Sequence, residues 1–519
     1  MLPQMVRGPG RKRIDMNVFK GMNRSEAAHD GEIYTMKNMS SDKFPLLCPR
    51  KERKLMYTLT APGGMHADDN LYYADGTGFY SNGVLKGTVT AGRKTFCTIG
   101  DYVIILPDKK YYDRTGNTFG SLEETYVSGA GEITFSDGTY AGVTAEANTI
   151  VTTGTAFAFK AGDNVTISGS TNNNKTAIIR EISDDKKTLR FYELTFDIEG
   201  TTFTELGAVT LKRAVPDMNY ILENDNRLWG CGSDTLYACK LGDPFNWMNY
   251  DNLSTASYYA DVGSPGDFTG CAVYLGYPMF FKEDIVYKIY GEKPSNFEII
   301  PIFTTGCEKD SGRSFTLGNE TLFYLSRNGV TAYGGGSPAI ISEPLNARFT
   351  GAAAGSDGSK LYISMKDSEY GLYVYDTRYG TWHREDAIQA TDFVSFGGKL
   401  YMLTLGGEIW EIDGGGEGII ESETEFGDFY EATPDAKYMA RMLARCEVDE
   451  GASLTFYLSY DGDTWEEAGE ITAGDKRMKL LPMIPRRADR IRLKIAGTGN
   501  YTIYGLTREY TTGNRERRK

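Results

Sequence analysis

The chain has 519 residues, which is long enough for two to four domains. Of its residues, 40% are hydrophobic and 24% are charged, a composition that argues against a disordered protein. Its 70 acidic and 56 basic residues give a net charge of −14, which argues against a broad basic surface for nucleic acid. The 60 glycines, 35 tyrosines and 25 phenylalanines favour aromatic strands joined by glycine turns. We therefore expect an all-β protein.

Residues 1–43 are predicted to be an amino-terminal arm and lead-in. The opening "MLPQMVRGPGRKR" carries Arg7, Arg11, Lys12 and Arg13 and is stiffened by Pro9. It contains no apolar core of a signal peptide, and the chain has no run of eighteen apolar residues. We expect synthesis in the cytoplasm and no membrane insertion.

A repeated hairpin pattern dominates residues 44–121 and 213–415. In each copy an aromatic strand is followed by a polar or glycine turn and a second strand. The seven copies span residues 69–83, 100–116, 226–243, 277–291, 320–336, 359–382 and 398–413. Equivalent positions recur about every 40 residues, the length of one four-stranded propeller blade. The sequence predicts a β-propeller of six to eight blades, in which residues 44–59 are a candidate for completing a blade begun at the far end.

The stretch "LYVYDTRYGTWHRED" (372–386) combines one of three histidines with one of five tryptophans. Strand alternation places Trp382 on the packed face and leaves His383 and Arg384 near solvent or a blade seam. We interpret the stretch as part of a blade, with Asp376 and Gly380 in its turn, and not as a catalytic pocket.

Several segments break the repeat. Residues 122–212 are Thr- and Gly-rich and are predicted to form an inserted β-barrel or sandwich. Residues 408–435 contain ten acidic and no basic residues, so 416–435 is predicted to be an acidic linker. A carboxy-terminal β-sandwich is expected over 436–510, followed by a basic tail at 511–519.

The motifs of common catalytic sites are missing. There is no G-x-S-x-G elbow, no phosphate loop and no compelling Cys/His pair, so we predict a protein that is not an enzyme and has no cofactor. The seven cysteines form no C-x-x-C pair, which suggests buried free thiols. "SYDGDTW" (459–465) approaches an Asp-box turn, but its spacing does not fit a calcium loop and we predict no metal site.

The two terminal segments, residues 7–13 and 513–519, are basic, although the chain as a whole is acidic. One interpretation is that both are solvated ends; the other is that they lie on acidic surfaces of neighbouring subunits and help to set their register. The predicted assembly contacts are Arg7, Arg11, Lys12, Arg13, Arg515, Arg517 and Arg518.

Residues 19–53 resemble the opening of β-propeller structural proteins of tailed bacteriophages and prophages. The matching elements are an F-x-G-x-N start (Phe19, Gly21, Asn23), a D-G-E step (30–32), an N-M-S-S-D stretch (38–42) and P-L-L-x-P-R (45–50). The propeller followed by a sandwich is more distantly similar to tail-hub, nozzle and packaged-DNA-stabilisation proteins of short-tailed phages.

The resemblance implies a structural virion protein, a subunit of a tail hub or nozzle assembled in the host cytoplasm. It implies a ring of six copies below the portal and adaptor that contacts other tail proteins, retains the packaged genome and conducts DNA at ejection. An acidic wall would let DNA slide without specific binding. The alternative is a propeller adhesin that recognises a host receptor or glycan.

Overall fold

The computed structural model describes residues 11–25, 29–198, 200–431, 436–474, 477–481 and 486–512. It is all-β, and its strands divide between two compact units. One unit comprises residues 60–307; the other joins residues up to 59 with those from 308 onward. Among the described residues, no helix is long and apolar enough to cross a membrane.

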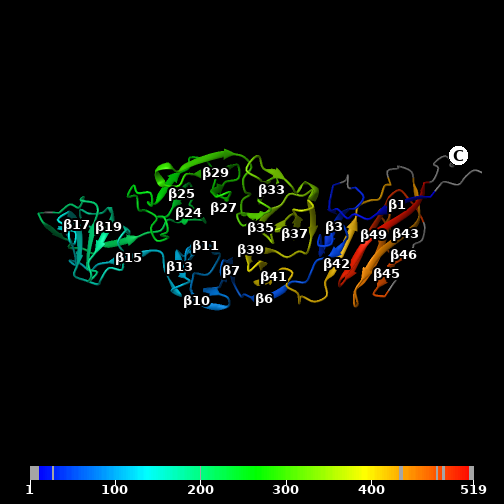
Figure 1. The fold of residues 1–519 in the computed structure, drawn as a ribbon, viewed down its shortest axis with the longest axis horizontal. Helices are drawn as coiled ribbons and strands as arrows, with labels where there is room; N and C mark the ends of the chain where they lie inside the picture. The colour runs from blue at the N-terminus through cyan, green and yellow to red at the C-terminus, as the bar shows by residue number, and fades with distance from the viewer. Residues whose placement is uncertain are drawn as a thin grey trace, which may run out of the picture. The chain divides into compact units, whose positions relative to one another are not determined.

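Within the described residues, seven four-stranded antiparallel sheets are the propeller blades, which confirms the predicted β-propeller class (Figure 1). Each of the seven sequence hairpins supplies the two middle strands of one blade. Four blades belong to the unit formed by residues 60–307. The first is β7 (Pro62–Ala67), β8 (Leu71–Asp75), β9 (Gly78–Ser81) and β10 (Val84–Thr88). The second is β11 (Thr95–Ile99), β12 (Tyr102–Leu106), β13 (Lys110–Asp113) and β14 (Thr118–Ser121). The third is β23 (Tyr220–Asn224), β24 (Arg227–Cys231), β25 (Thr235–Ala238) and β26 (Tyr258–Asp261). The fourth is β27 (Gly270–Tyr274), β28 (Tyr277–Phe281), β29 (Ile285–Tyr290) and β30 (Glu298–Phe303), with the 3-10 turn η1 (Pro294–Asn296) before β30.

The other unit holds three blades. The fifth is β31 (Thr316–Gly318), β32 (Thr321–Ser326), β33 (Gly329–Tyr333) and β34 (Ala339–Ile340), followed by η2 (Glu343–Leu345). The sixth is β35 (Thr350–Ser356), β36 (Lys360–Lys366), β37 (Tyr370–Asp376) and β38 (Thr381–Arg384). The seventh is β39 (Ala390–Phe396), β40 (Lys399–Thr404), β41 (Glu408–Glu411) and β6 (Lys54–Thr58). The pairing of β6 with β41 confirms that residues 44–59 complete a blade begun at the far end.

The insertion between the second and third blades forms one eight-stranded sheet around its own core, which includes Phe135, Phe159 and Phe191. The chain enters and leaves it through the antiparallel pair of its first and last strands. The strands are β15 (Glu124–Val127), β16 (Ile133–Thr139), β17 (Glu146–Thr152), β18 (Asn164–Ser168), β19 (Thr176–Ile182), β20 (Thr188–Phe191), β21 (Thr202–Thr204) and β22 (Thr210–Arg213).

The sandwich is built from both ends of the chain. One sheet contains β1 (Lys12–Met16), β49 (Tyr501–Thr512), β43 (Lys437–Val448), β46 (Met478–Leu480) and β47 (Arg487–Ala488). The other contains β2 (Gly21–Met22), β3 (Glu32–Lys37), β42 (Glu421–Phe426), β48 (Ile491–Thr498), β44 (Ser453–Tyr460) and β45 (Glu466–Thr472). A short pair, β4 (Met39–Ser40) and β5 (Cys48–Pro49), follows β3.

Two sequence expectations are corrected here. The predicted lead-in of residues 1–43 supplies strands β1, β2 and β3 of the sandwich. The predicted acidic linker contains β42, which pairs with β3 and β48. In "ESETEF" the glutamates alternate with Ser422, Thr424 and Phe426, which are buried, so the segment keeps its charges outside while its other face packs inward.

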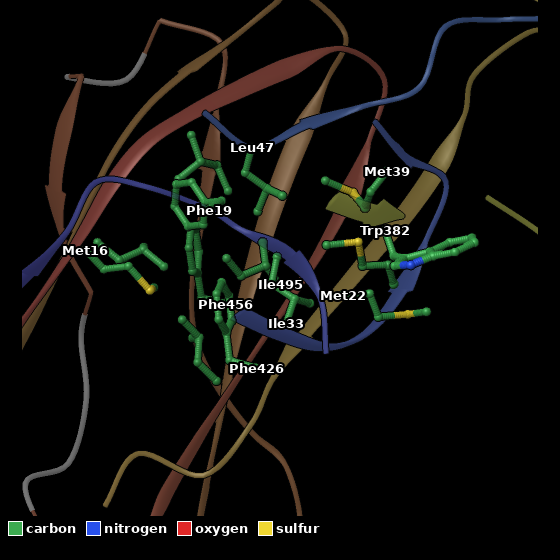
Figure 2. Close-up of a cluster of buried hydrophobic side chains, with 14 of the residues drawn as sticks. Met16, Phe19, Met22, Ile33, Met39, Leu47, Trp382, Phe426, Phe456 and Ile495 are labelled. Carbon is green, nitrogen blue, oxygen red and sulfur yellow. The ribbon is translucent and has the colours of Figure 1, made fainter. Parts of the chain in front are cut away.

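A continuous hydrophobic core joins the sandwich to the fifth and sixth blades (Figure 2). Met22 and Met39, from strands that accompany the sandwich, share this core with Trp382 of the sixth blade. The Trp382 indole N–H donates to the carbonyl of Ile341 at 2.8 Å. Trp382 is 2% exposed, as predicted. His383, predicted near solvent or a blade seam, is also buried, because the amino-terminal strands β2, β3 and β4 cover β38.

Candidate functional site: the joint between sandwich and blades

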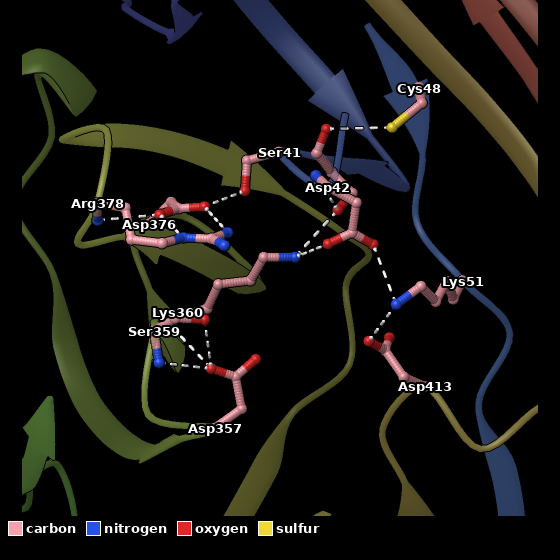
Figure 3. Close-up of polar contacts among 11 residues, drawn as sticks. Ser41, Asp42, Cys48, Lys51, Asp357, Ser359, Lys360, Asp376, Arg378 and Asp413 are labelled. Carbon is pink, nitrogen blue, oxygen red and sulfur yellow. Dashed lines mark hydrogen bonds and ion pairs between the residues drawn. The ribbon is translucent and has the colours of Figure 1, made fainter. Parts of the chain in front are cut away.

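A cluster of buried ion pairs and hydrogen bonds lies where residues 38–53 meet the sixth and seventh blades. We call it the joint. Figure 3 shows its first half, around Lys360 and Asp376. The Lys360 ammonium contacts the Asp42 carboxylate and lies 3.2 Å from the Ser40 hydroxyl. The Ser41 hydroxyl donates to Asp376 at 2.6 Å, so two consecutive loop residues are bound to one blade.

Asp376 is fully buried at the end of β37. Arg378 donates to both of its carboxylate oxygens, at 3.0 and 2.7 Å (Figure 3). Burial alone would raise the pKa of Asp376, but the hydrogen bonds from Arg378 and Ser41 lower it overall. Asp42 behaves in the same way: burial opposes ionisation, and Lys360 brings its pKa below the usual value. Both carboxylates are therefore held as anions.

The second half of the joint contains two arginines. Arg53 donates to Glu385 at 2.5 Å and to Asp386 at 2.7 Å. Arg50 makes a bidentate pair with Glu417, at 2.6 and 2.8 Å. Such forked contacts fix orientation as well as charge. Glu417, which lies between the seventh blade and β42, is thus bound to the segment that leads into β6.

His383 lies in the same region and is uncharged. Burial lowers its pKa to about 4, and nearby Lys360 acts in the same direction. Its Nδ1 has no hydrogen-bond partner among the described residues. A histidine that is neutral, enclosed and covered by β-strands does not have the access to solvent that a general base needs.

Residues of the 19–53 segment take part in this architecture. Gly21 has a φ of +83°, and a Cβ there would lie 2.6 Å from the Trp382 carbonyl oxygen, so any larger residue would push β2 off the sixth blade. Asn38, also at positive φ, accepts from Arg50 at 2.9 Å, while its backbone N–H donates to the Glu385 carbonyl at 2.6 Å. Asp30 pairs with the buried Arg508 at 2.9 Å. These motif residues hold the fold together.

The predicted assembly residues are only partly described. Arg7, Arg515, Arg517 and Arg518 lie outside the described residues. Arg11 is exposed just before β1, and Lys12 and Arg13 lie on β1 itself. Arg13 pairs with Asp15 at 3.0 Å in an exposed ion pair. β1 is an end strand of its sheet, so these cations stand along a sheet edge.

The other sequence candidates have structural roles. In "SYDGDTW", the Asp461 carboxylate accepts the backbone N–H groups of Asp489 and Arg490, at 2.7 and 3.0 Å. Among the described residues, no three His, Cys, Asp or Glu side chains are placed to hold a metal ion. The insertion contacts the loop that follows β25, because Asn246 of that loop donates to Asp163 at 3.1 Å. Asp163 also pairs with Arg213 on β22 of the insertion itself, at 2.6 Å.

Sequence reasoning missed the joint. Lys360 and Asp376 looked like ordinary turn and strand-end residues because their partners lie more than 300 positions away. The signal that the sequence did contain was the group of polar residues Asn38, Ser40, Ser41 and Asp42 close to the apolar residues of 45–47.

No protein-family model and no curated protein matches this chain. Among solved structures it is similar to BamB from Moraxella catarrhalis, at 12% identity and a TM-score of 0.36 over 71% of this chain and 99% of BamB. The computationally designed Ika8 protein matches at 10% identity and a TM-score of 0.34, over 69% of this chain and 99% of Ika8. PorZ from Porphyromonas gingivalis matches at 11% identity and a TM-score of 0.27, covering 88% and 77%. TM-scores this low carry no argument about function.

Proposed function

We propose that this chain is a structural virion protein of a tailed bacteriophage, a tail hub or nozzle subunit. Six copies form a ring below the portal and adaptor, assembled in the host cytoplasm. The ring helps to retain the packaged genome and conducts DNA at ejection. The protein acts through its surfaces and its rigidity and not through catalysis.

The observation that carries this proposal is the role of the phage-like opening. Its residues connect the sandwich to the blades. Gly21 packs closely against Trp382, Asp42 forms an ion pair with Lys360, and Arg50 forms an ion pair with Glu417. Motif residues that stabilise the fold are consistent with a protein that acts through its shape. A wall that must hold its shape while DNA passes needs its domains fixed in this way, because packed and ion-paired joints resist deformation.

Charge supports the same proposal. A net charge of −14 disfavours adhesion to DNA phosphates, which suits a conduit through which the genome has to slide. Arg11, Lys12 and Arg13 form a local exception on an exposed sheet edge. Cations at an edge of an otherwise acidic protein are suited to contact the acidic surface of another copy.

The test is the mass of the purified protein in solution, alone and with the portal-adaptor components encoded beside its gene. We expect a six-copy ring, formed alone or on the adaptor. The double variant Lys12→Glu/Arg13→Glu is expected to weaken ring formation by about tenfold, since it reverses two charges at the proposed contact. Lys186→Glu/Lys187→Glu, which reverses two charges on the β19–β20 turn, is the matched control and should assemble normally.

A persistent monomer or trimer that ignores the adaptor but sediments with host cells would overturn the proposal in favour of the adhesin. Equal loss of assembly in both double variants would refute the specific role of the β1 edge.

A further inference from the structure

A cavity of about 800 Å³ lies where the third and fourth blades meet, within the unit of residues 60–307. Its walls come from the β23–β24 turn, the β27–β28 turn and the connector around η1. The size is that of a site for a small ligand of a few rings. Its lining includes Asp225, Trp229, Tyr277, Tyr290, Glu292 and Asn296.

Aromatic rings form one part of the lining. Tyr277 and Tyr290 are half-buried neighbours whose ring centroids are 4.8 Å apart. The ammonium of Lys288 lies over both rings, 4.1 Å from the Tyr277 centroid and 4.9 Å from the Tyr290 centroid, and Lys288 is not among the residues that line the cavity. Deeper in the cavity, Trp229 meets Phe297 edge-on at 4.9 Å. The rings are therefore fixed in place and present flat apolar surface.

Hydrogen-bond acceptors and a hydrogen-bond donor lie at the rim of the cavity. Asn224 donates to one oxygen of Asp225 at 2.8 Å, which orients that carboxylate. Glu292 lines the cavity and is exposed. The side-chain oxygen of Asn296 accepts the backbone N–H groups of Glu292 and Lys293, at 3.1 and 3.0 Å, which leaves its NH2 group to donate.

The floor is rigid. Arg227 is buried, and its guanidinium donates to the carbonyls of Cys239 and Ala256 at 2.5 and 2.6 Å. It also stacks over Phe297, at 5.5 Å from the ring centroid. Binding at such a preformed site costs little ordering entropy.

We infer that this cavity binds a neutral saccharide. A pyranose ring has a face of C–H groups and an edge of hydroxyls that both donate and accept hydrogen bonds. The Tyr277 and Tyr290 rings offer apolar surface to that face, and Glu292, Asp225 and the Asn296 amide offer acceptors and a donor to that edge. A phosphate or an acidic ligand would be repelled by the two rim carboxylates, and a purely apolar ligand would desolvate them.

The inference goes beyond the proposed structural role, since a ring subunit does not need a saccharide site. It is tested with the full chain and no adaptor, so its failure is separate from failure of the hub proposal. The probes are maltotetraose, cellotetraose, chitotetraose and mannotetraose, titrated calorimetrically at up to 10 mM.

We expect at least one tetrasaccharide to bind. Tyr290→Ala should weaken that binding by about tenfold or more through lost ring contact. Glu292→Ala, at an exposed position that does not support the fold, should weaken it by about tenfold through the lost charged acceptor. Tyr259→Ala removes an exposed tyrosine from β26, outside the cavity, and should leave the affinity unchanged.

Three results would overturn the inference. The first is no binding of any tetrasaccharide at 10 mM. The second is binding that survives both Tyr290→Ala and Glu292→Ala. The third is binding that Tyr259→Ala weakens as much as the cavity variants do, which would locate the sugar elsewhere.

Discussion

Replacing Arg53 with alanine tests whether the joint stabilises the protein as strongly as its geometry implies. Arg53 is 1% exposed and donates to Glu385 and Asp386. Burial alone would lower the pKa of Arg53, but the two carboxylates raise it overall, so it remains charged. The substitution leaves Glu385 buried beside Arg50, which lies 3.7 Å away. Breaking a buried ion pair in this way costs about 3–5 kcal/mol.

The assay is urea unfolding, monitored by circular dichroism. The free energy of unfolding is taken from the transition in which the unit that contains the joint unfolds. Arg13→Ala is the matched control, because it removes the same side chain from an exposed pair, where about 0–1 kcal/mol is expected. Replacing both Arg53 and Glu385 with apolar residues should recover part of the loss. If Arg53→Ala costs no more than Arg13→Ala, the reasoning about the joint is wrong.

The same variant has a predicted pH dependence. Burial raises the pKa of Glu385 above its usual value even in the intact protein, and the arginines offset this only in part. Without Arg53 the folded state binds this proton more tightly than the unfolded state does. Stability of Arg53→Ala should therefore fall, relative to the parent, as the pH rises above about 4.5. A difference that does not change between pH 4.5 and 7 would contradict this assignment.

Three further outcomes are expected. Gly21→Ala should lower the free energy of unfolding by about 2–4 kcal/mol, whereas Gly451→Ala, at a similar positive φ but with open space around it, should cost about 1 kcal/mol; equal effects would contradict the contact with Trp382. Because the pKa of His383 is lowered to about 4, the unfolded state binds its proton first, and the protein should lose up to about 3 kcal/mol as the pH falls from 6.5 to 4. His383→Gln should flatten that slope in urea titrations at each pH. Iodoacetamide at pH 7.5 should modify the thiols of the native protein slowly, and all seven thiols should react in urea. The reason is burial, which raises the pKa of Cys239 to about 12. Rapid labelling of several thiols in the native protein would refute their enclosure.

The propeller was predictable because its information is local. Each blade hairpin lies within about 20 residues, and the spacing from Met279 to Leu322, Leu361 and Leu400 repeats one structural unit. The pairing of β6 with β41 followed from the same repeat, since the seventh hairpin needed a fourth strand.

The sandwich and the joint were much harder to predict from the sequence. β1 pairs with β49, and β3 pairs with β42, so in both pairs the partner is hundreds of residues away. Alternation in "ESETEF" was visible, but ten acidic residues nearby made a solvated linker the simpler interpretation. His383 was misjudged because its own strand gives no sign of the strands that cover it. The predicted contacts at Arg11, Lys12 and Arg13 remain a prediction about assembly.

The closing strand β6 has a consequence for synthesis on the ribosome. Residues 54–58 leave the exit tunnel early, yet their partner β41 begins only at Glu408. At about 5–20 residues per second, the intervening 59–407 take on the order of tens of seconds to translate. During that time β6 has no β41 to pair with. A chain that terminates before Glu408 lacks β41, so β6 has no strand to pair with and the seventh blade cannot close.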